Sequence, residues 1–133
     1  MKSIVLILTQ DELVIKKMKT VSPLERYELH FHTFQLKPLL ILLETDISAI
    51  FIDIGNHEDF CIGMLEIIKR IQPYLPIIAL TDSINTEDMR QLTQKGIFYT
   101  IMKPIQETEL ENIFLALDRH LAKQKERFHY ILN

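Results

Sequence analysis

Hydrophobic residues form five short runs that alternate with segments of helical spacing. The run 3–9 is continuously apolar, which is typical of a parallel strand buried on both faces. The run 27–34 alternates apolar with polar residues, which indicates a strand with one wetter face at a sheet edge. The other strand-like runs are 47–53, 77–81 and 98–103.

Between these runs, apolar residues recur with the period of an amphipathic helix. Acidic residues suit a first helical turn, Asn or Thr can cap a helix start, and Gly or Pro can end a helix. The helices are expected between Asp11 and Ser22, from Pro38 to Leu43, around the stripe Leu65, Ile68 and Ile71, from Asn85 or Thr86 to Gly96, and from Gln106 to Leu121.

Alternating strands and helices predict the α/β class, with a single five-stranded parallel sheet and helices on both faces. Periodicity alone does not determine the strand order. At this length the flavodoxin-like order 2-1-3-4-5 is expected, and the edge character of 27–34 agrees with its place as the second strand.

Composition narrows the functional classes. The chain has 133 residues, of which 47% are hydrophobic, enough for one globular domain with a sizeable core. The net charge of −3 and the lack of a basic tract give no reason to expect direct nucleic-acid binding. The single cysteine, Cys61, excludes an intramolecular disulfide and suits a reducing compartment. No apolar run is long enough for a signal peptide or membrane span, so we expect a cytoplasmic protein without a membrane partner.

Three polar residues lie at the ends of three strand-like runs. Asp53 ends the third, Thr81 ends the fourth, and Lys103 ends the fifth. Parallel strands place their carboxyl ends at one sheet edge, where ligands collect. A carboxylate, a hydroxyl and an ammonium at that edge predict an anion-handling site.

The span 3–121 resembles a response-regulator receiver domain of two-component signalling. The matching segments are IFIDIG, GMLEIIKRIQPYLPIIALTDS and KGIFYTIMKPI. The resemblance implies that Asp53 is the phospho-acceptor, that Thr81 and Lys103 contact the phosphoryl group, and that the Lys103–Pro104 peptide bond is cis. It further implies a regulatory phospho-acceptor, with no enzymatic activity beyond self-catalysed phosphoryl transfer. A histidine kinase or phosphotransfer protein would be upstream, and another protein or effector domain downstream.

The resemblance also implies a Mg²⁺ ion, which prefers oxygen ligands and often takes one or two carboxylates with phosphate and water. Its ligands would be Asp53, the carbonyl of Gly55 and an acidic pair after the first strand. That pair is incomplete here, because it falls on Thr9-Gln10 if the apolar run is aligned and on Gln10-Asp11 if the helix stripe is aligned. We prefer the second alignment, which makes Asp11 a metal ligand in a weakened site.

Other positions depart from the family pattern. Asp82 follows Thr81 where the family has a small residue, so it either repels a phosphoryl donor or pairs with Lys103. Thr100 falls where the family has an aromatic switch residue. These departures leave open an alternative function, in which the domain is a pseudo-receiver that binds a protein partner without phosphorylation. A small flavodoxin-like binding protein is a third, weaker possibility, since no phosphate-binding loop and no tryptophan occur.

The C-terminal residues 122–133 continue the last apolar stripe only loosely. They are either an extension of the last helix or the start of a linker, beyond a receiver domain at 1–121. Their apolar residues could also pack against a second subunit in a homodimer or against a following domain. Together with Ile97, Phe98 and Tyr99, they lead us to expect a protein interface on the face of the fourth helix, fifth strand and last helix.

Overall fold

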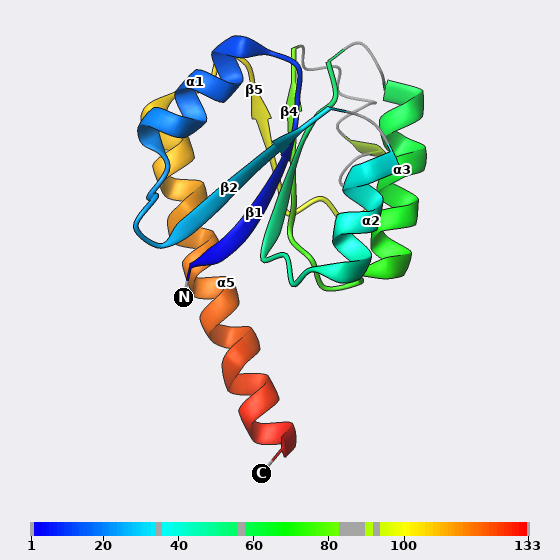
Figure 1. Cartoon of the computed structure of the whole chain (residues 1–133), viewed down its shortest axis with the longest axis vertical. Helices are drawn as coiled ribbons and strands as arrows, with labels where there is room; N and C mark the ends of the chain where they lie inside the picture. Colours follow the sequence, from blue (N-terminus) through cyan, green and yellow to red (C-terminus); the bar gives the residue numbers. More distant parts are fainter. Residues whose placement is uncertain (1, 34–35, 56–57, 83–89, 92–93, 133) are drawn as a thin grey trace.

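The computed structural model describes residues 2–33, 36–55, 58–82, 90–91 and 94–132. Five strands alternate with helices along the chain (Figure 1). The strands are β1 (Ser3–Leu8), β2 (Tyr27–His32), β3 (Ala49–Asp53), β4 (Ile77–Thr81) and β5 (Tyr99–Met102). The helices are α1 (Glu12–Val21), α2 (Leu36–Glu44), α3 (Glu58–Ile71) and α5 (Glu107–Leu132).

The strands form one parallel sheet in the order β2-β1-β3-β4-β5. This confirms the expected flavodoxin-like order and the edge position of the second strand. The register pairs Asp53 with Leu80 and Thr81 with Met102. The carboxyl ends of β3, β4 and β5 therefore meet at the same edge of the sheet.

Helices cover both faces of the sheet, with α1 and α5 on one side and α2 and α3 on the other (Figure 1). Two separate hydrophobic clusters fill the two interfaces. Buried residues on the α1 and α5 side include Val5, Ile7, Phe51, Ile78, Leu80, Ile101, Met18, Ile113, Phe114 and Leu117. Those on the α2 and α3 side include Leu6, Leu8, Ile50, Ile52, Ile77, Leu42, Met64, Leu65 and Ile68. Because the central strands are buried on both faces, the end of β3 lies in a closely packed part of the sheet.

Several element boundaries differ from the expected ones by a few residues. β1 ends at Leu8, and the side chain of Thr9 turns to a polar partner described below. Helix α2 begins at Leu36, before Pro38. Proline is tolerated there because amide groups of the first turn lack intrahelical acceptors. β5 ends at Met102, one residue before Lys103.

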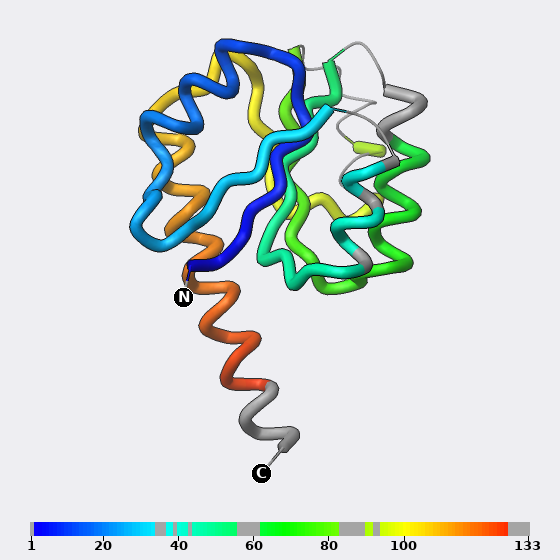
Figure 2. Tube along the Cα trace, in the orientation of Figure 1, coloured from blue at the N-terminus to red at the C-terminus, as the bar shows by residue number. Residues whose placement is uncertain are grey.

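The last helix is longer than the apolar stripe up to Leu121 suggested. Helix α5 continues through residues 122–132 without a break and spans about 39 Å at 1.5 Å per residue. The tube in Figure 2 follows it beyond the end of the sheet. The Gln124 side chain donates a hydrogen bond to the Tyr74 carbonyl at 3.2 Å, so the helix still contacts the domain there. In the described part of the chain, no helix is both long enough and apolar enough to cross a membrane.

The helix expected from Asn85 or Thr86 to Gly96 lies mostly outside the described residues. Its predicted stop is described: Gly96 has a φ of 84°, the left-handed conformation that favours glycine after a helix. A Cβ atom at this position would lie 3.2 Å from Cε of Lys69, so a residue with a side chain would crowd the Lys69 side chain.

Tyr27 links the edge strand β2 to α5. Its ring centroid lies 5.0 Å from that of Phe114, and its hydroxyl donates to Oδ1 of Asp118 at 2.6 Å. The other oxygen of Asp118 accepts from Arg26 at 3.0 Å. Burial, followed by the hydrogen bond to Asp118, raises the pKa of Tyr27 well above its usual value. The hydroxyl therefore remains a donor at neutral pH.

The Tyr27→Phe variant should lose about 1.5–2 kcal/mol of unfolding free energy, because it removes a hydrogen bond from the buried Tyr27 hydroxyl to the charged, partly exposed carboxylate of Asp118. Urea denaturation measures the difference. Tyr74→Phe is the matched control, since Tyr74 is 79% exposed and its change should stay within about 0.5 kcal/mol. Equal losses in the two variants would contradict a stabilising role for the Tyr27 hydroxyl.

Candidate functional site at the carboxyl edge of the sheet

The ends of three neighbouring strands place the predicted site residues. Asp53 is the last residue of β3, and Thr81 is the last residue of β4. The amide of Lys103 donates to the carbonyl of Thr81 at 2.8 Å, which ties the segment after β5 to the end of β4. The Lys103–Pro104 peptide bond is cis, as expected. The hydrogen bond to Thr81 holds the Lys103 backbone at the edge of the sheet where Asp53 lies.

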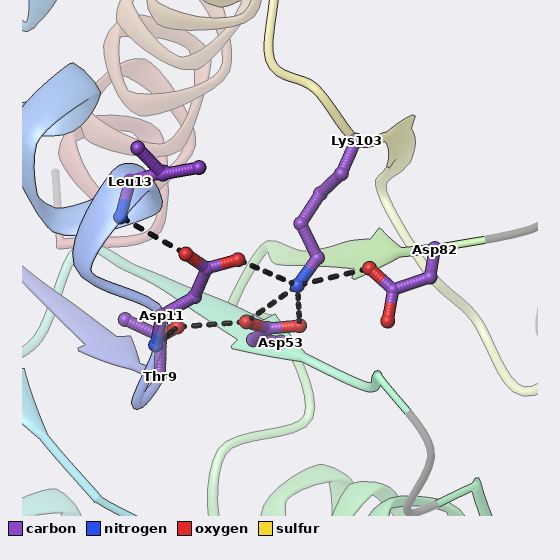
Figure 3. A network of polar contacts seen from close by, with 6 residues as sticks. All are labelled: Thr9, Asp11, Leu13, Asp53, Asp82 and Lys103. Carbon is purple, nitrogen blue, oxygen red and sulfur yellow. Dashed lines mark hydrogen bonds and ion pairs between the residues drawn. The ribbon is translucent and has the colours of Figure 1, made fainter.

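Lys103 and Asp53 form the centre of this pocket (Figure 3). The Lys103 ammonium lies 2.9 Å from each carboxylate oxygen of Asp53. Asp53 is 7% exposed as a residue, and the side chain of Lys103 is 13% exposed. An ion pair so far removed from water is screened less than a surface pair. The structure thus brings the Lys103 ammonium and the Asp53 carboxylate into contact, and Thr81 ends the neighbouring strand, where its carbonyl accepts from the Lys103 amide.

Two further carboxylates contact the same ammonium. Oδ2 of Asp11 and Oδ1 of Asp82 each lie 3.2 Å from Nζ of Lys103 (Figure 3). An ammonium has three N–H donors, and here three carboxylates surround it. The contact of Asp82 with Lys103 confirms the alternative in which Asp82 pairs with this lysine. Since three negative groups face one positive group, the pocket carries an excess of negative charge.

These carboxylates decide the charge state of Lys103. Partial burial alone would lower the pKa of Lys103. Hydrogen bonds to Asp53 and Asp82 and the attraction of the carboxylates outweigh that effect and raise the pKa above its usual value. The side chain is therefore positively charged at neutral pH.

Thr9 is a member of this network whose role was not predicted from the sequence. Its hydroxyl donates to Oδ2 of Asp53 at 2.7 Å and accepts from the amide of Asp11 at 3.0 Å. Thr9 is 2% exposed, whereas Gln10 is exposed. Each of the two candidate alignments of the acidic pair therefore contributes one residue to the pocket: Thr9 beside Asp53, and Asp11 beside Lys103. The available signal was that Thr9 is the first polar residue after the apolar run.

Asp11 has two roles in the structure. It caps α1, because its Oδ1 accepts from the amide of Leu13 at 2.9 Å, and its other oxygen reaches Lys103. Desolvation would raise the pKa of Asp11, but the Leu13 amide and Lys103 together lower it below its usual value. A carboxyl with a lowered pKa stabilises the fold above its ordinary pKa of about 3.9, and this contribution disappears as the pH falls through the lowered value.

Variants of Asp11 should separate the two roles. Asp11→Asn keeps a good helix cap and loses only the partly exposed ion pair with Lys103. Its free energy of unfolding should therefore fall by less than about 1 kcal/mol at pH 7. The difference from wild type should vanish as the pH falls through the lowered pKa of Asp11, because the carboxyl is then protonated. Asp11→Ala also loses the cap, which should cost about 1 kcal/mol more at neutral and at acid pH. Thermal unfolding over a pH series from 7 down to the acid range in which Asp11 is protonated measures both effects, and a loss in Asp11→Asn that stays the same over the whole series would contradict the ion-pair role.

The donor set around Asp53 fits a hard cation such as Mg²⁺ in its chemistry. Oδ1 of Asp53 is buried and accepts no hydrogen bond from the described residues, although Lys103 lies within ion-pair distance. Gly55 has a φ of 49°, and a Cβ atom there would lie 3.7 Å from this oxygen. Within the described ranges, no three His, Cys, Asp or Glu side chains are grouped to hold a metal. A cation would therefore need water and the Gly55 carbonyl besides Asp11 and Asp53.

Comparisons with known proteins identify the fold. No family model matches the sequence, and no curated protein matches it. Solved structures do match over most of the chain. A receiver-domain protein (CheY-like) from Methanospirillum hungatei JF-1 is 21% identical, with a TM-score of 0.76 and 92% of this chain and 99% of that chain covered. A response regulator from Thermotoga maritima is 13% identical, with a TM-score of 0.78 and coverage of 89% and 99%.

A third similar structure is a response regulator from Burkholderia pseudomallei, solved with a phosphorylated aspartic acid, a calcium ion and citrate. It is 19% identical, with a TM-score of 0.68 and 96% of this chain and 73% of that chain covered. At these identities the similarity concerns the fold. Together with the strand order β2-β1-β3-β4-β5, the matches confirm the resemblance seen in the sequence. The chain has the CheY-like fold of response-regulator receiver domains.

Proposed function

We propose that this chain is a receiver domain of a two-component system, in which Asp53 accepts a phosphoryl group from a histidine kinase or a phosphotransfer protein. The observation that carries the proposal is the contact of the Lys103 ammonium with both oxygens of Asp53 at 2.9 Å, at the carboxyl edge of a receiver-type sheet. The phosphorylated aspartic acid of the structurally similar Burkholderia protein supports the same chemistry.

In the proposed reaction, a carboxylate oxygen of Asp53 attacks phosphorus and forms an acyl phosphate. The bond from phosphorus to the donor's histidine nitrogen breaks. The nitrogen keeps the electron pair of that bond and then takes up a proton. Oδ2 of Asp53 contacts both Thr9 and Lys103, whereas Oδ1 contacts Lys103 but not Thr9, which favours Oδ1 as the attacking oxygen. Phosphoryl transfer depends mainly on positioning and charge neutralisation. Lys103 supplies a positive charge, and Thr81 supplies a hydroxyl at the same edge.

A magnesium ion, when bound, would neutralise negative charge on the transferred phosphoryl group. Asp11, Asp53 and the carbonyl of Gly55 would hold it. The Asp11 carboxylate lies 3.2 Å from the Lys103 ammonium, so this ion pair would compete with metal binding. Because the acidic pair contributes a single carboxylate here, we expect weak Mg²⁺ binding.

The signal would leave through the face of the fifth strand and last helix. Ile97 and Phe98 are half-buried and pack against the two hydrophobic clusters. Tyr99 and Met102, at the two ends of edge strand β5, are 45% and 48% exposed. Apolar side chains available to a kinase-regulated partner or a second copy of the domain are therefore Tyr99 and Met102, which lie on opposite faces of β5, with Ile97 and Phe98 contributing little.

A pseudo-receiver that binds a partner without phosphorylation is the second candidate function. The observation that favours it is the saturation of Lys103, whose three N–H donors face the carboxylates of Asp11, Asp53 and Asp82. A pocket closed in this way could serve only to stabilise the fold.

Beryllofluoride, which mimics a phosphoryl group, separates the two functions. We expect added beryllofluoride and Mg²⁺ to shift the amide resonances of residues at the ends of β3, β4 and β5 in wild type. The Asp53→Asn variant, which lacks the attacking carboxylate but keeps its shape, should show no such shifts. An unresponsive wild type at high Mg²⁺ would favour the pseudo-receiver.

A further inference from the structure

Asp82 contacts the pocket from the loop that follows β4, immediately after Thr81. Its Oδ1 lies 3.2 Å from Nζ of Lys103. Its Oδ2 and Oδ1 of Asp53 both face Gly55, because a Cβ atom built there would lie 3.8 Å from the first and 3.7 Å from the second. The two carboxylates therefore approach the same small space from two sides. A phosphoryl group attached to Asp53 would have to share that space with Asp82.

The three carboxylates around Lys103 differ in how firmly they are held. Asp53 is buried and accepts a hydrogen bond from Thr9. Asp11 is fixed by the amide of Leu13, which it caps. In the described part of the chain, Lys103 is the only partner of the Asp82 carboxylate, and the Asp82 side chain is 51% exposed. Asp82 is therefore the carboxylate that can leave Lys103 for water at the smallest cost.

We propose that Asp82 is an internal competitor of the phosphoryl group. In the resting protein its carboxylate occupies the N–H donor of Lys103 that a phosphoryl oxygen needs, and on phosphorylation it is displaced into solvent. This inference rests on the proposed phosphoryl transfer to Asp53. Asp82 takes no part in forming or breaking a bond to phosphorus, so it is not a catalytic residue. Asp82 makes transfer of the phosphoryl group to Asp53 less favourable, because it occupies Lys103 and because its negative charge repels the phosphoryl group. The domain therefore responds only to a strong phosphoryl donor or to a high donor concentration.

The affinity for beryllofluoride at saturating Mg²⁺ tests this role, measured by titration and amide NMR. Asp82→Asn keeps the size of the side chain and removes its charge. We expect beryllofluoride to bind this variant about fivefold more tightly than wild type at low salt, which corresponds to about 1 kcal/mol and to an exposed ion pair at the upper end of its usual range. The gain should shrink at about 1 M salt, because screening weakens the competing pair and the repulsion. A purely steric effect of Asp82 would not depend on salt.

Asp46→Asn is the matched control, since it removes the same charge from an exposed residue before β3, at the opposite edge of the sheet. It should bind beryllofluoride as wild type does. If wild type and Asp82→Asn bind equally, the competition is disproved while phosphoryl acceptance by Asp53 stands. If neither protein responds, both the proposed function and the competition are disproved. Both the proposed function and the competition are supported if Asp82→Asn binds beryllofluoride more tightly than wild type, Asp46→Asn does not, and the double variant Asp82→Asn, Asp53→Asn loses the binding.

Discussion

Replacing Lys103 by methionine is expected to lower the free energy of unfolding by about 2–3 kcal/mol near pH 7. Removing one partner of a buried ion pair typically costs about 3–5 kcal/mol, because the other charge stays buried without compensation. Asp53 is such a charge, at 7% exposure, and Asp11 would remain close to it. We expect a smaller loss than for full burial, because Asp82 is half-exposed and can turn into water.

Acid should narrow this difference between wild type and the Lys103→Met variant. The pKa of Lys103 is raised, so the stabilising contribution of its positive charge is fully present below the ordinary lysine pKa of about 10.4. Acid does not change the charge of Lys103 and so does not remove this contribution by itself. The loss in acid comes from its partners. The pKa of Asp11 is lowered, so pairing with Asp11 is present above about pH 3.9 and disappears as the pH falls through the lowered value.

Urea denaturation at pH 7 and at pH 3.5 measures both effects. Lys95→Met is the matched control, because it breaks an ion pair between exposed side chains, Lys95 and Glu66, and should cost much less unfolding free energy than Lys103→Met. Millimolar Mg²⁺ should restore part of the stability of Lys103→Met, since the metal can replace the lost cation. A Lys103 variant as stable as the Lys95 variant would show that the pocket does not depend on this charge.

Thr9→Asp is expected to bind Mg²⁺ about tenfold more tightly than wild type, a difference of about 1.4 kcal/mol. The Thr9 hydroxyl lies 2.7 Å from Oδ2 of Asp53, so an aspartate there places a second carboxylate directly beside the first. Without metal the two like charges repel each other, and we expect the variant to be less stable than wild type at pH 7. Added Mg²⁺ should reverse that order, because a ligand that binds only the folded state stabilises it.

Isothermal titration with Mg²⁺ and thermal unfolding with and without the metal measure the two effects of Thr9→Asp. Thr9→Asn is the control, since it introduces a side chain of the same shape without the charge. It should gain no Mg²⁺ affinity. Equal affinities of the Asp and Asn variants would mean that the metal does not bind beside Asp53.

Most of the fold could be predicted from the sequence because each element carries its own signal. The apolar runs, the acidic first turns and the left-handed Gly96 are local features, and the structure contains the strands and the stop that they indicate. The strand order was expected from the length of the chain, and the edge pattern of 27–34, which is half-exposed along most of β2, agreed with it. Whether 122–133 extend the last helix or begin a linker was left open, because the apolar stripe continues only loosely after Leu121, and the structure contains the helical extension through Leu132.

The site could be predicted only in outline. Asp53, Thr81 and Lys103 were found because a parallel sheet brings strand ends together whatever the side chains are. The hydrogen bond from Thr9 to Asp53 was not predicted, since a threonine after a β-branched run is most simply explained as a strand residue. The pairing of Asp82 with Lys103 remained one of two alternatives, because sequence spacing does not determine which way a loop carboxylate turns.

The identity of the phosphorylated residue tests the central claim most directly. Wild type should be incubated with Mg²⁺ and a small acyl-phosphate donor, then analysed by intact-protein mass and by mapping of the modified peptide. We predict a single phosphoryl adduct on Asp53 that is absent from Asp53→Asn. No adduct on the wild type, or an adduct at another residue, would contradict the claim that Asp53 and Lys103 form a phospho-acceptor site.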